Sequence, residues 1–260
     1  EFRRVLFRSY ILHHNVVLNT IYHSYISLVI FLKEVSFMTQ KIKHNLRKIK
    51  DPGSALTHFI AMVLAAAAAV PLLIKGSRSP EQFHLAALAV FILSMIGLYG
   101  ASTIYHTLDI SPKINQLLRK IDHMMIFVLI AGTYTPVCLI VLGDQTGWAL
   151  LALVWVIAVL GIFINAFWIT CPKWFSSMIY IAMGWICILA FSKILAALPK
   201  AGFLWLLAGG IIYTLGGVIY ALKLPIFNAR HQYFGSHEIF HLFVMGGSLC
   251  HYMMMYQFVA

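Results

Sequence analysis

Two histidines four residues apart, His237 and His241, open the last apolar stretch of the chain. On a helix, residues at this spacing lie on one face, one above the other. Imidazole is a good zinc ligand, and the spacing lets both rings reach one ion. Ionisable groups in a membrane segment are costly to bury, so by default they mark a functional site. His237 and His241 are therefore predicted metal ligands.

Further polar residues on other apolar stretches are expected at the same depth. Ser102 and His106 are four residues apart and close the second stretch, and Asp122 opens the third. Three histidines leave a fourth tetrahedral position for water, which is typical of a catalytic zinc site. We predict His106, His237 and His241 as ligands of a zinc ion that activates water. Asp122 would hold that water or act as general base, and Ser102 would orient Asp122 or donate to a developing oxyanion.

Each of these roles has a simpler structural alternative. A membrane histidine often only hydrogen-bonds a neighbouring helix, Asp122 would also suit the N-terminus of the third helix, and Ser102 would serve as an interhelical hydrogen-bonder. The last stretch also fits His-Glu-x-x-His, in which Glu238 would be the general base of a zinc protease. No Asp or Glu follows Glu238 to supply a further ligand, so the protease is a minor alternative. Three more histidines are candidates for supporting the ligands: His58, His123 and His251.

Composition places these residues in a membrane protein. Of 260 residues, 61% are hydrophobic and 10% are charged, whereas a soluble domain has about 25% charged residues. Seven apolar stretches have about the length that a bilayer-spanning helix needs, and backbone groups in lipid must be satisfied within the segment. We predict an all-α, polytopic, seven-transmembrane-helix bundle over residues 54–260. Its spans are expected at 54–74, 83–106, 121–142, 147–168, 175–197, 203–223 and 236–258.

Lysines and arginines orient the predicted bundle. With the N-terminus inside, the inner segments hold most of them, so the positive-inside rule places residues 38–53 in the cytoplasm and the C-terminus outside. The net charge of +11 is then cytoplasmic loop charge, which favours anionic lipid headgroups rather than nucleic acid. The inner segments hold Lys41, Lys43, Arg47, Lys48, Lys50, Lys113, Arg119, Lys120, Lys173, Lys223 and Arg230, and the outer loops hold Lys75, Arg78 and Lys200.

Residues 1–37 differ in character from the rest. The first nine residues are similar to translated adaptor sequence, and residues 33–35 can be encoded by a ribosome-binding sequence shortly before Met38. We expect translation to start at Met38 and residues 1–37 to be upstream or adaptor-derived sequence, so they are set aside in fold reasoning. The alternative is a genuine amphipathic or signal-like N-terminus.

Taken jointly, the motifs resemble a known family. Ser102-x3-His106, Asp122 and the Ser-His-Glu-x2-His segment that ends at His241 resemble the haemolysin III branch of the progestin and adiponectin receptor (PAQR) superfamily. The resemblance extends from Asp51 to the C-terminus and includes the Leu-Thr-His segment at 56–58. The family often has Glu and Asn in the motif before the first span, where this chain has Asp51 and Ser54.

The resemblance implies a seven-helix protein of the bacterial cell membrane, with a cytoplasmic-side zinc bound by His106, His237 and His241. It implies kinship with receptors that hydrolyse ceramide and with alkaline ceramidases, while the family name implies lysis of host cells by pore formation. A metal in an inner-leaflet cavity suits a lipid that enters sideways, and a chain with seven spans and no long soluble segment suits a resident enzyme. We favour zinc-dependent hydrolysis of a lipid amide. Cytolysis, a receptor with structural zinc and an intramembrane protease are the alternatives.

Overall fold

The computed structural model describes residues 30, 33, 49–167, 173–222 and 235–260. The chain divides into two units, Glu1–Lys48 and Ile49–Ala260, and the helices below belong to the second. The predictions for residues 1–37, for most of 38–53, and for Lys223 and Arg230 lie outside the described residues.

The regular structure of the described residues is entirely helical. Helices occupy the described part of each predicted stretch, and six spans are long and apolar enough to cross a membrane. The last predicted span falls short by composition, since it carries three histidines and Glu238, so the count of seven stays a prediction. The elements are α2 (Pro52–Gly76), α3 (His84–Thr107), α4 (Pro112–Pro136) with the π-helical η1 (Val137–Leu142), α5 (Gln145–Phe167), α6 (Lys173–Gly184), the 3₁₀ segment η2 (Trp185–Ala190), α7 (Phe191–Ala197), α8 (Lys200–Leu222), α9 (Ser236–Met254) and the π-helical η3 (Met255–Val259).

Helix α4 begins earlier than its apolar stretch predicted. Ser111 is the N-cap and accepts a hydrogen bond from the Ile114 N–H at 3.4 Å. Pro112 occupies the first turn, where a backbone N–H would have no acceptor within the helix, so the proline costs no hydrogen bond. The first turns of α4 are polar and basic, so a search for apolar residues passes over them. Asp122 therefore lies almost three turns inside α4, and the alternative that it caps this helix is wrong.

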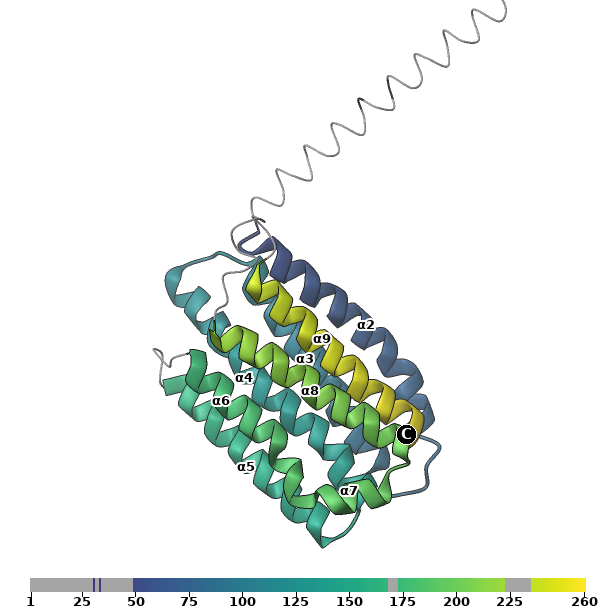
Figure 1. Ribbon diagram of the computed structural model, residues 1–260. Coiled ribbons are helices and arrows are strands. Elements are labelled where there is room, and N and C mark those ends of the chain that lie inside the picture. Colours follow the sequence, from purple (N-terminus) through teal and green to yellow (C-terminus); the bar gives the residue numbers. More distant parts are fainter. Residues whose placement is uncertain (1–29, 31–32, 34–48, 168–172, 223–234) are drawn as a thin grey trace, which may run out of the picture. The chain divides into compact units, whose positions relative to one another are not determined.

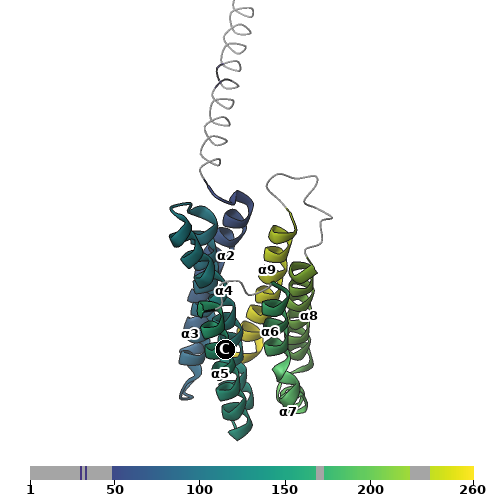
Figure 2. The same ribbon diagram turned by 90° about the vertical axis from the view of Figure 1, so that its left-hand side faces the viewer.

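The helices form a closed arrangement in which the first and last described spans touch. Helix α2 packs against α3 and α9, α3 against α4, α4 against α5 and α6, and α8 against α6 and α9. Figure 1 shows these long helices running alongside one another, and Figure 2 shows the same bundle from the side. Because α2 and α9 are neighbours, residues from the first and last helices of this unit meet in one site.

Glycines on one face of α5 allow its close approach to α4 and η1. A Cβ atom at Gly147 would lie 2.2 Å from the Cys138 carbonyl oxygen, and one at Gly161 would lie 2.3 Å from the Phe127 ring. Gly147 and Gly161 are fourteen residues, close to four turns, apart, so they share a face. Small residues at such positions let membrane helices pack backbone to backbone.

One end of the bundle gathers the predicted functional residues. Helices α2 and α9 begin there, and α3 ends there. The Asp51 N–H donates to the His106 carbonyl oxygen at 2.9 Å, which ties the start of α2 to the end of α3. We call this the histidine end of the bundle.

Candidate metal centre and adjoining cavity

Three histidines from two helices converge at the histidine end. His106 comes from the last turn of α3, and His237 and His241 come from the first turns of α9. One ring nitrogen from each lies within 4.8 Å of the others. The Nε2 atoms of His106 and His237 are 3.2 Å apart, close to the roughly 3.3 Å that separates two nitrogen ligands of a tetrahedral zinc ion. The cluster is therefore able to hold a metal ion, as the spacing predicted.

Two residues from the start of α2 contact the outer nitrogens of these rings. His106 Nδ1 lies 2.9 Å from Asp51 Oδ2, and His241 Nδ1 lies 3.1 Å from Thr57 Oγ1. The hydrogen bond with His106 holds the pKa of the Asp51 carboxyl below its ordinary value, although partial burial opposes that shift. Sequence reasoning assigned Asp51 and Thr57 no role at the metal centre. The available signal was their position, because the resemblance to a known motif at the first span includes both.

Asp122 and Ser102 lie near His106, and their catalytic roles stay predictions. The Asp122 carboxyl interacts electrostatically with His106, Arg119 and the Ser102 hydroxyl. Ser102 is 1% exposed, and within the described residues its Oγ makes no hydrogen bond of good geometry. A buried hydroxyl beside a carboxylate is placed to orient it, or to donate to a group that arrives between them.

Glu238 is engaged away from the metal position. Its Oε2 accepts from the Gly235 N–H at 2.7 Å, which caps the first turn of α9, and its Oε1 accepts a short hydrogen bond from the Ser54 hydroxyl. This arrangement is one half of a capping box. Both carboxylate oxygens therefore serve helix packing, and the geometry disfavours Glu238 as a protease base.

A line of buried polar side chains runs from the histidine cluster into the bundle. The His58 ring stacks on the His241 ring with centroids 3.6 Å apart, and Tyr99 meets His58 edge to face at 5.1 Å. The Tyr99 hydroxyl donates to Ser248 Oγ at 2.7 Å, and the Tyr213 hydroxyl lies 2.8 Å from the same oxygen. This polar column explains why the histidine-bearing face of α9 remains polar beyond His241.

His123 and His251 each lie beside a tyrosine of α8. The His123 Nε2 atom is 3.3 Å from the Tyr220 hydroxyl. The His251 ring stacks on Tyr213 with centroids 5.4 Å apart, and within the described residues its Nδ1 makes no hydrogen bond. That these two histidines support the metal ligands stays a prediction.

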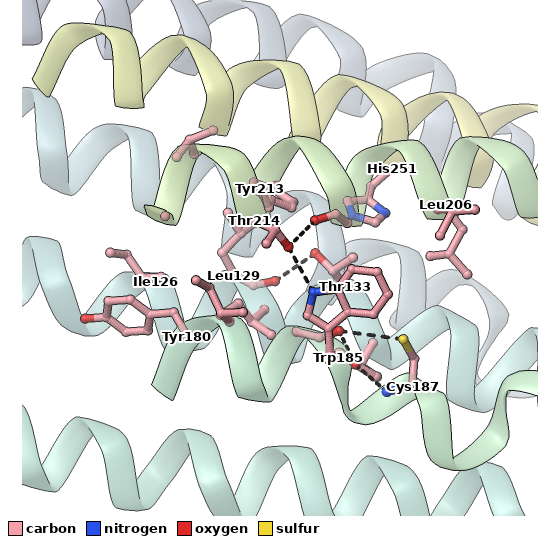
Figure 3. A pocket seen from close by; sticks show the side chains of 18 of the residues that line it. Ile126, Leu129, Thr133, Tyr180, Trp185, Cys187, Leu206, Tyr213, Thr214 and His251 are labelled. Carbon is pink, nitrogen blue, oxygen red and sulfur yellow. Dashed lines mark hydrogen bonds between the residues drawn. The ribbon is translucent and has the colours of Figure 1, made fainter. Parts of the chain in front are cut away.

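A cavity adjoins the histidine end between α4, α6, α8 and α9. Its volume is about 160 Å³, and none of the described residues that line it carries a formal charge. Figure 3 shows Leu129, Leu206 and Trp185 among its walls, and its polar members include Thr133, Tyr213, Thr214 and His251. Tyr220 and Phe240 line the cavity and also contact His237, with ring centroids 5.8 and 6.2 Å from it. Two aromatic rings thus connect an apolar cavity to the histidine cluster.

Comparison with known proteins identifies the family of the chain. A family model described as "Haemolysin-III related" matches residues 46–252, which include all the residues of the cluster. Hemolysin-3 of Bacillus cereus is 37% identical over 212 residues, covering 81% of this chain and 93% of that protein. The Hemolysin-3 homolog of Bacillus subtilis (strain 168) is 37% identical over 199 residues, covering 76% and 89%.

A more distant similarity extends to the receptors named in the resemblance. The adiponectin receptor protein of Drosophila melanogaster is 24% identical over 224 residues, covering 78% of this chain and 49% of that protein. Apolar helical spans and bacterial relatives together make this a multi-pass cell membrane protein. The chain belongs to the haemolysin-III related family.

Proposed function

We propose that this protein is a zinc-dependent hydrolase of a lipid amide, with its site on the cytoplasmic side of the membrane. The observation that carries the proposal is the convergence of His106, His237 and His241 beside the Asp122 carboxyl. Three imidazoles are the ligand set of a zinc site that keeps one position open. A bound zinc ion would supply Lewis acidity, which lowers the pKa of water toward neutrality and makes it a nucleophile.

The protein's own side chains provide the remaining functions. Asp122 orients the attacking water and accepts its proton, and the buried Ser102 hydroxyl positions that carboxylate. Hydrolysis adds the water oxygen to the amide carbonyl carbon and breaks the C–N bond. The proton held by Asp122 then passes to the leaving amine.

The cavity supports a lipid as the substrate class. An uncharged, largely apolar lining accommodates an alkyl chain by burial of apolar surface. Tyr220 and Phe240 join the cavity to His237, so a chain in the cavity would place its polar end near the histidines. A ceramide-like amide has this combination of long chain and amide head.

The test measures metal content and turnover on the same protein. The full chain is purified in detergent as wild type, His237→Ala and Asp122→Asn, and fatty acid release from ceramide-like amides is followed. We expect about one zinc per chain in wild type and Asp122→Asn, and loss of zinc in His237→Ala. Hydrolysis should disappear in His237→Ala and fall by about 10²- to 10⁴-fold in Asp122→Asn.

A histidine at the opposite end of α3 provides the matched control. His84→Gln changes a buried histidine far along the same helix from His106, so zinc and turnover should persist. Zinc in the wild type without turnover on any lipid amide would reject the hydrolase in favour of a receptor or a structural site. Absence of metal from the wild type would reject the metal centre itself.

The name of the Bacillus cereus relative supports cytolysis as a second candidate function. The same purified protein, added to dye-loaded liposomes, tests it directly. Dye release that persists in His237→Ala, without lipid hydrolysis, would favour a pore over an enzyme.

A further inference from the structure

Three side chains at the start of α2 contact the histidines or the glutamate beside them. Asp51 immediately precedes the helix, and Ser54 and Thr57 follow at intervals of three residues, so the three side chains lie on adjoining parts of one face. Asp51 contacts His106, Ser54 contacts Glu238 beside His237, and Thr57 contacts His241. None of the three is close enough in sequence to α3 or α9 for these contacts to be local.

The contacts of Thr57 determine which nitrogen of His241 carries hydrogen. The single hydroxyl hydrogen of Thr57 is donated to the Ser54 carbonyl oxygen at 3.0 Å. Thr57 Oγ1 is then an acceptor toward His241, so His241 Nδ1 carries the hydrogen and donates it at 3.1 Å. The lone pair of His241 is left on Nε2, which is the atom available to a metal.

Asp51 imposes the same tautomer on His106. An ionised carboxylate only accepts hydrogen bonds, so His106 Nδ1 is the donor in the 2.9 Å contact with Asp51 Oδ2. The lone pair of His106 then lies on Nε2, the atom 3.2 Å from His237 Nε2. The Asp51 N–H also binds the His106 carbonyl oxygen, so both the backbone and the ring of His106 are held by one residue.

We propose that Asp51 and Thr57 are positioning residues of the metal centre, which fix the tautomer and ring orientation of His106 and His241. This inference rests on the proposed zinc site but not on the proposed hydrolysis. Hydrogen-bond partners of metal-bound histidines raise ligand basicity and orient the ring, and their loss typically lowers metal affinity by about 10- to 100-fold. The start of α2 is thus a functional part of the site without supplying a ligand.

The test is a direct measurement of metal affinity. Full-length protein in detergent is stripped of metal, and zinc binding is measured by competition with a chromophoric chelator for wild type, Asp51→Ala, Thr57→Val and Thr57→Ser. We expect Asp51→Ala and Thr57→Val each to weaken zinc binding by about 10- to 100-fold. Thr57→Ser keeps the hydroxyl and should bind like wild type. With cobalt in place of zinc, the visible spectrum should change in the two weak variants, reporting altered ligand geometry.

Thr103→Val is the matched control for general loss of a threonine hydroxyl. Thr103 lies one turn before His106, and its Oγ1 donates to the Tyr99 carbonyl oxygen of its own helix at 2.7 Å. Zinc affinity should be unchanged in this variant. Equal affinity in wild type, Asp51→Ala and Thr57→Val would overturn the proposal, as would an equal loss in Thr103→Val. Wild type that binds zinc tightly but turns over no lipid would refute the hydrolase while leaving this proposal standing.

Discussion

Glu238 illustrates how one side chain in a familiar motif can serve packing. It occupies the base position of His-Glu-x-x-His, yet one carboxylate oxygen caps α9 through the Gly235 N–H and the other accepts from Ser54. An acid at this position also favours the positive end of the helix dipole. At the scale of single residues, the partners of an atom decide its role, and the spacing of the motif alone does not.

Replacing Glu238 by Gln tests this interpretation. Gln has one acceptor oxygen where Glu has two, so one of the two hydrogen bonds is lost and unfolding should become easier by about 1 kcal/mol. Zinc content should be unchanged, and any lipid-amide turnover should fall far less than the roughly 10²-fold or more expected for a lost general base. Ser54→Ala removes the same hydrogen bond from the other side and should lower Tm similarly. Large loss of turnover at unchanged Tm would identify Glu238 as a base.

At the scale of elements, the packing of α5 depends on two glycines, which have no side chain. Gly147 and Gly161 face the neighbouring helices where a methyl group would overlap with a carbonyl oxygen or an aromatic ring. The absence of a side chain at Gly161 therefore makes room for the Phe127 ring of α4, and its absence at Gly147 lets the backbone of η1 approach α5. Because α4 carries Asp122, the fit of α5 also supports the wall of the site.

Gly147→Ala should destabilise the bundle, since its Cβ would meet a backbone oxygen that cannot rotate away. Overpacking of this kind costs about 1 to 3 kcal/mol, and thermal unfolding in detergent should show a lower Tm. Gly210→Ala in α8 is the control, since no atom lies within 4 Å of its new Cβ. Alanine is the better helix former, so its Tm should not fall. A Tm for Gly147→Ala at or above that of wild type would contradict the close packing of α5.

How far the sequence predicts the site depends on the range of each interaction. Spans follow from apolar length, and His237 and His241 from local spacing, so both were accessible. The start of α4 was missed because its first turns are polar and basic, whereas the spans were predicted from apolar length. The pairs Thr57–His241 and Ser54–Glu238 are each 184 residues apart. Such contacts depend on how α2 and α9 are rotated against one another, which no local pattern contains.

At the scale of the whole molecule, the orientation of the bundle decides which compartment the site faces. The histidine end also holds Lys50 and Arg119, both close enough to Asp122 to interact electrostatically. Basic residues at one end favour its retention in the cytoplasm. The predicted topology thus places the metal centre, the basic loops and the anionic headgroups of the inner leaflet together.

Reporter fusions at Ala260 test this topology. Alkaline phosphatase becomes active only outside the cytoplasm. Green fluorescent protein becomes fluorescent in the cytoplasm but stays dark after export by the general secretion route. With the C-terminus outside, the phosphatase fusion should be active and the fluorescent fusion dark. The same pair of fusions placed after Ser111, in the loop before α4, should show the opposite pattern. Reversal of both results would place the histidine end outside the cell.

The polar composition of α9 has a consequence for the biogenesis of the protein. His237, Glu238 and His241 contact partners on α2 and α3, which leave the ribosome long before α9 does. Entry of α9 into lipid alone would expose ionisable groups to hydrocarbon. Stable integration of the final segment therefore depends on the earlier ones. A nascent chain halted before residue 235 contains Asp51, Thr57 and His106 but lacks two of the three proposed ligands. If the proposed metal site forms, metal loading is accordingly a late step, which requires that His237 and His241 have been synthesised.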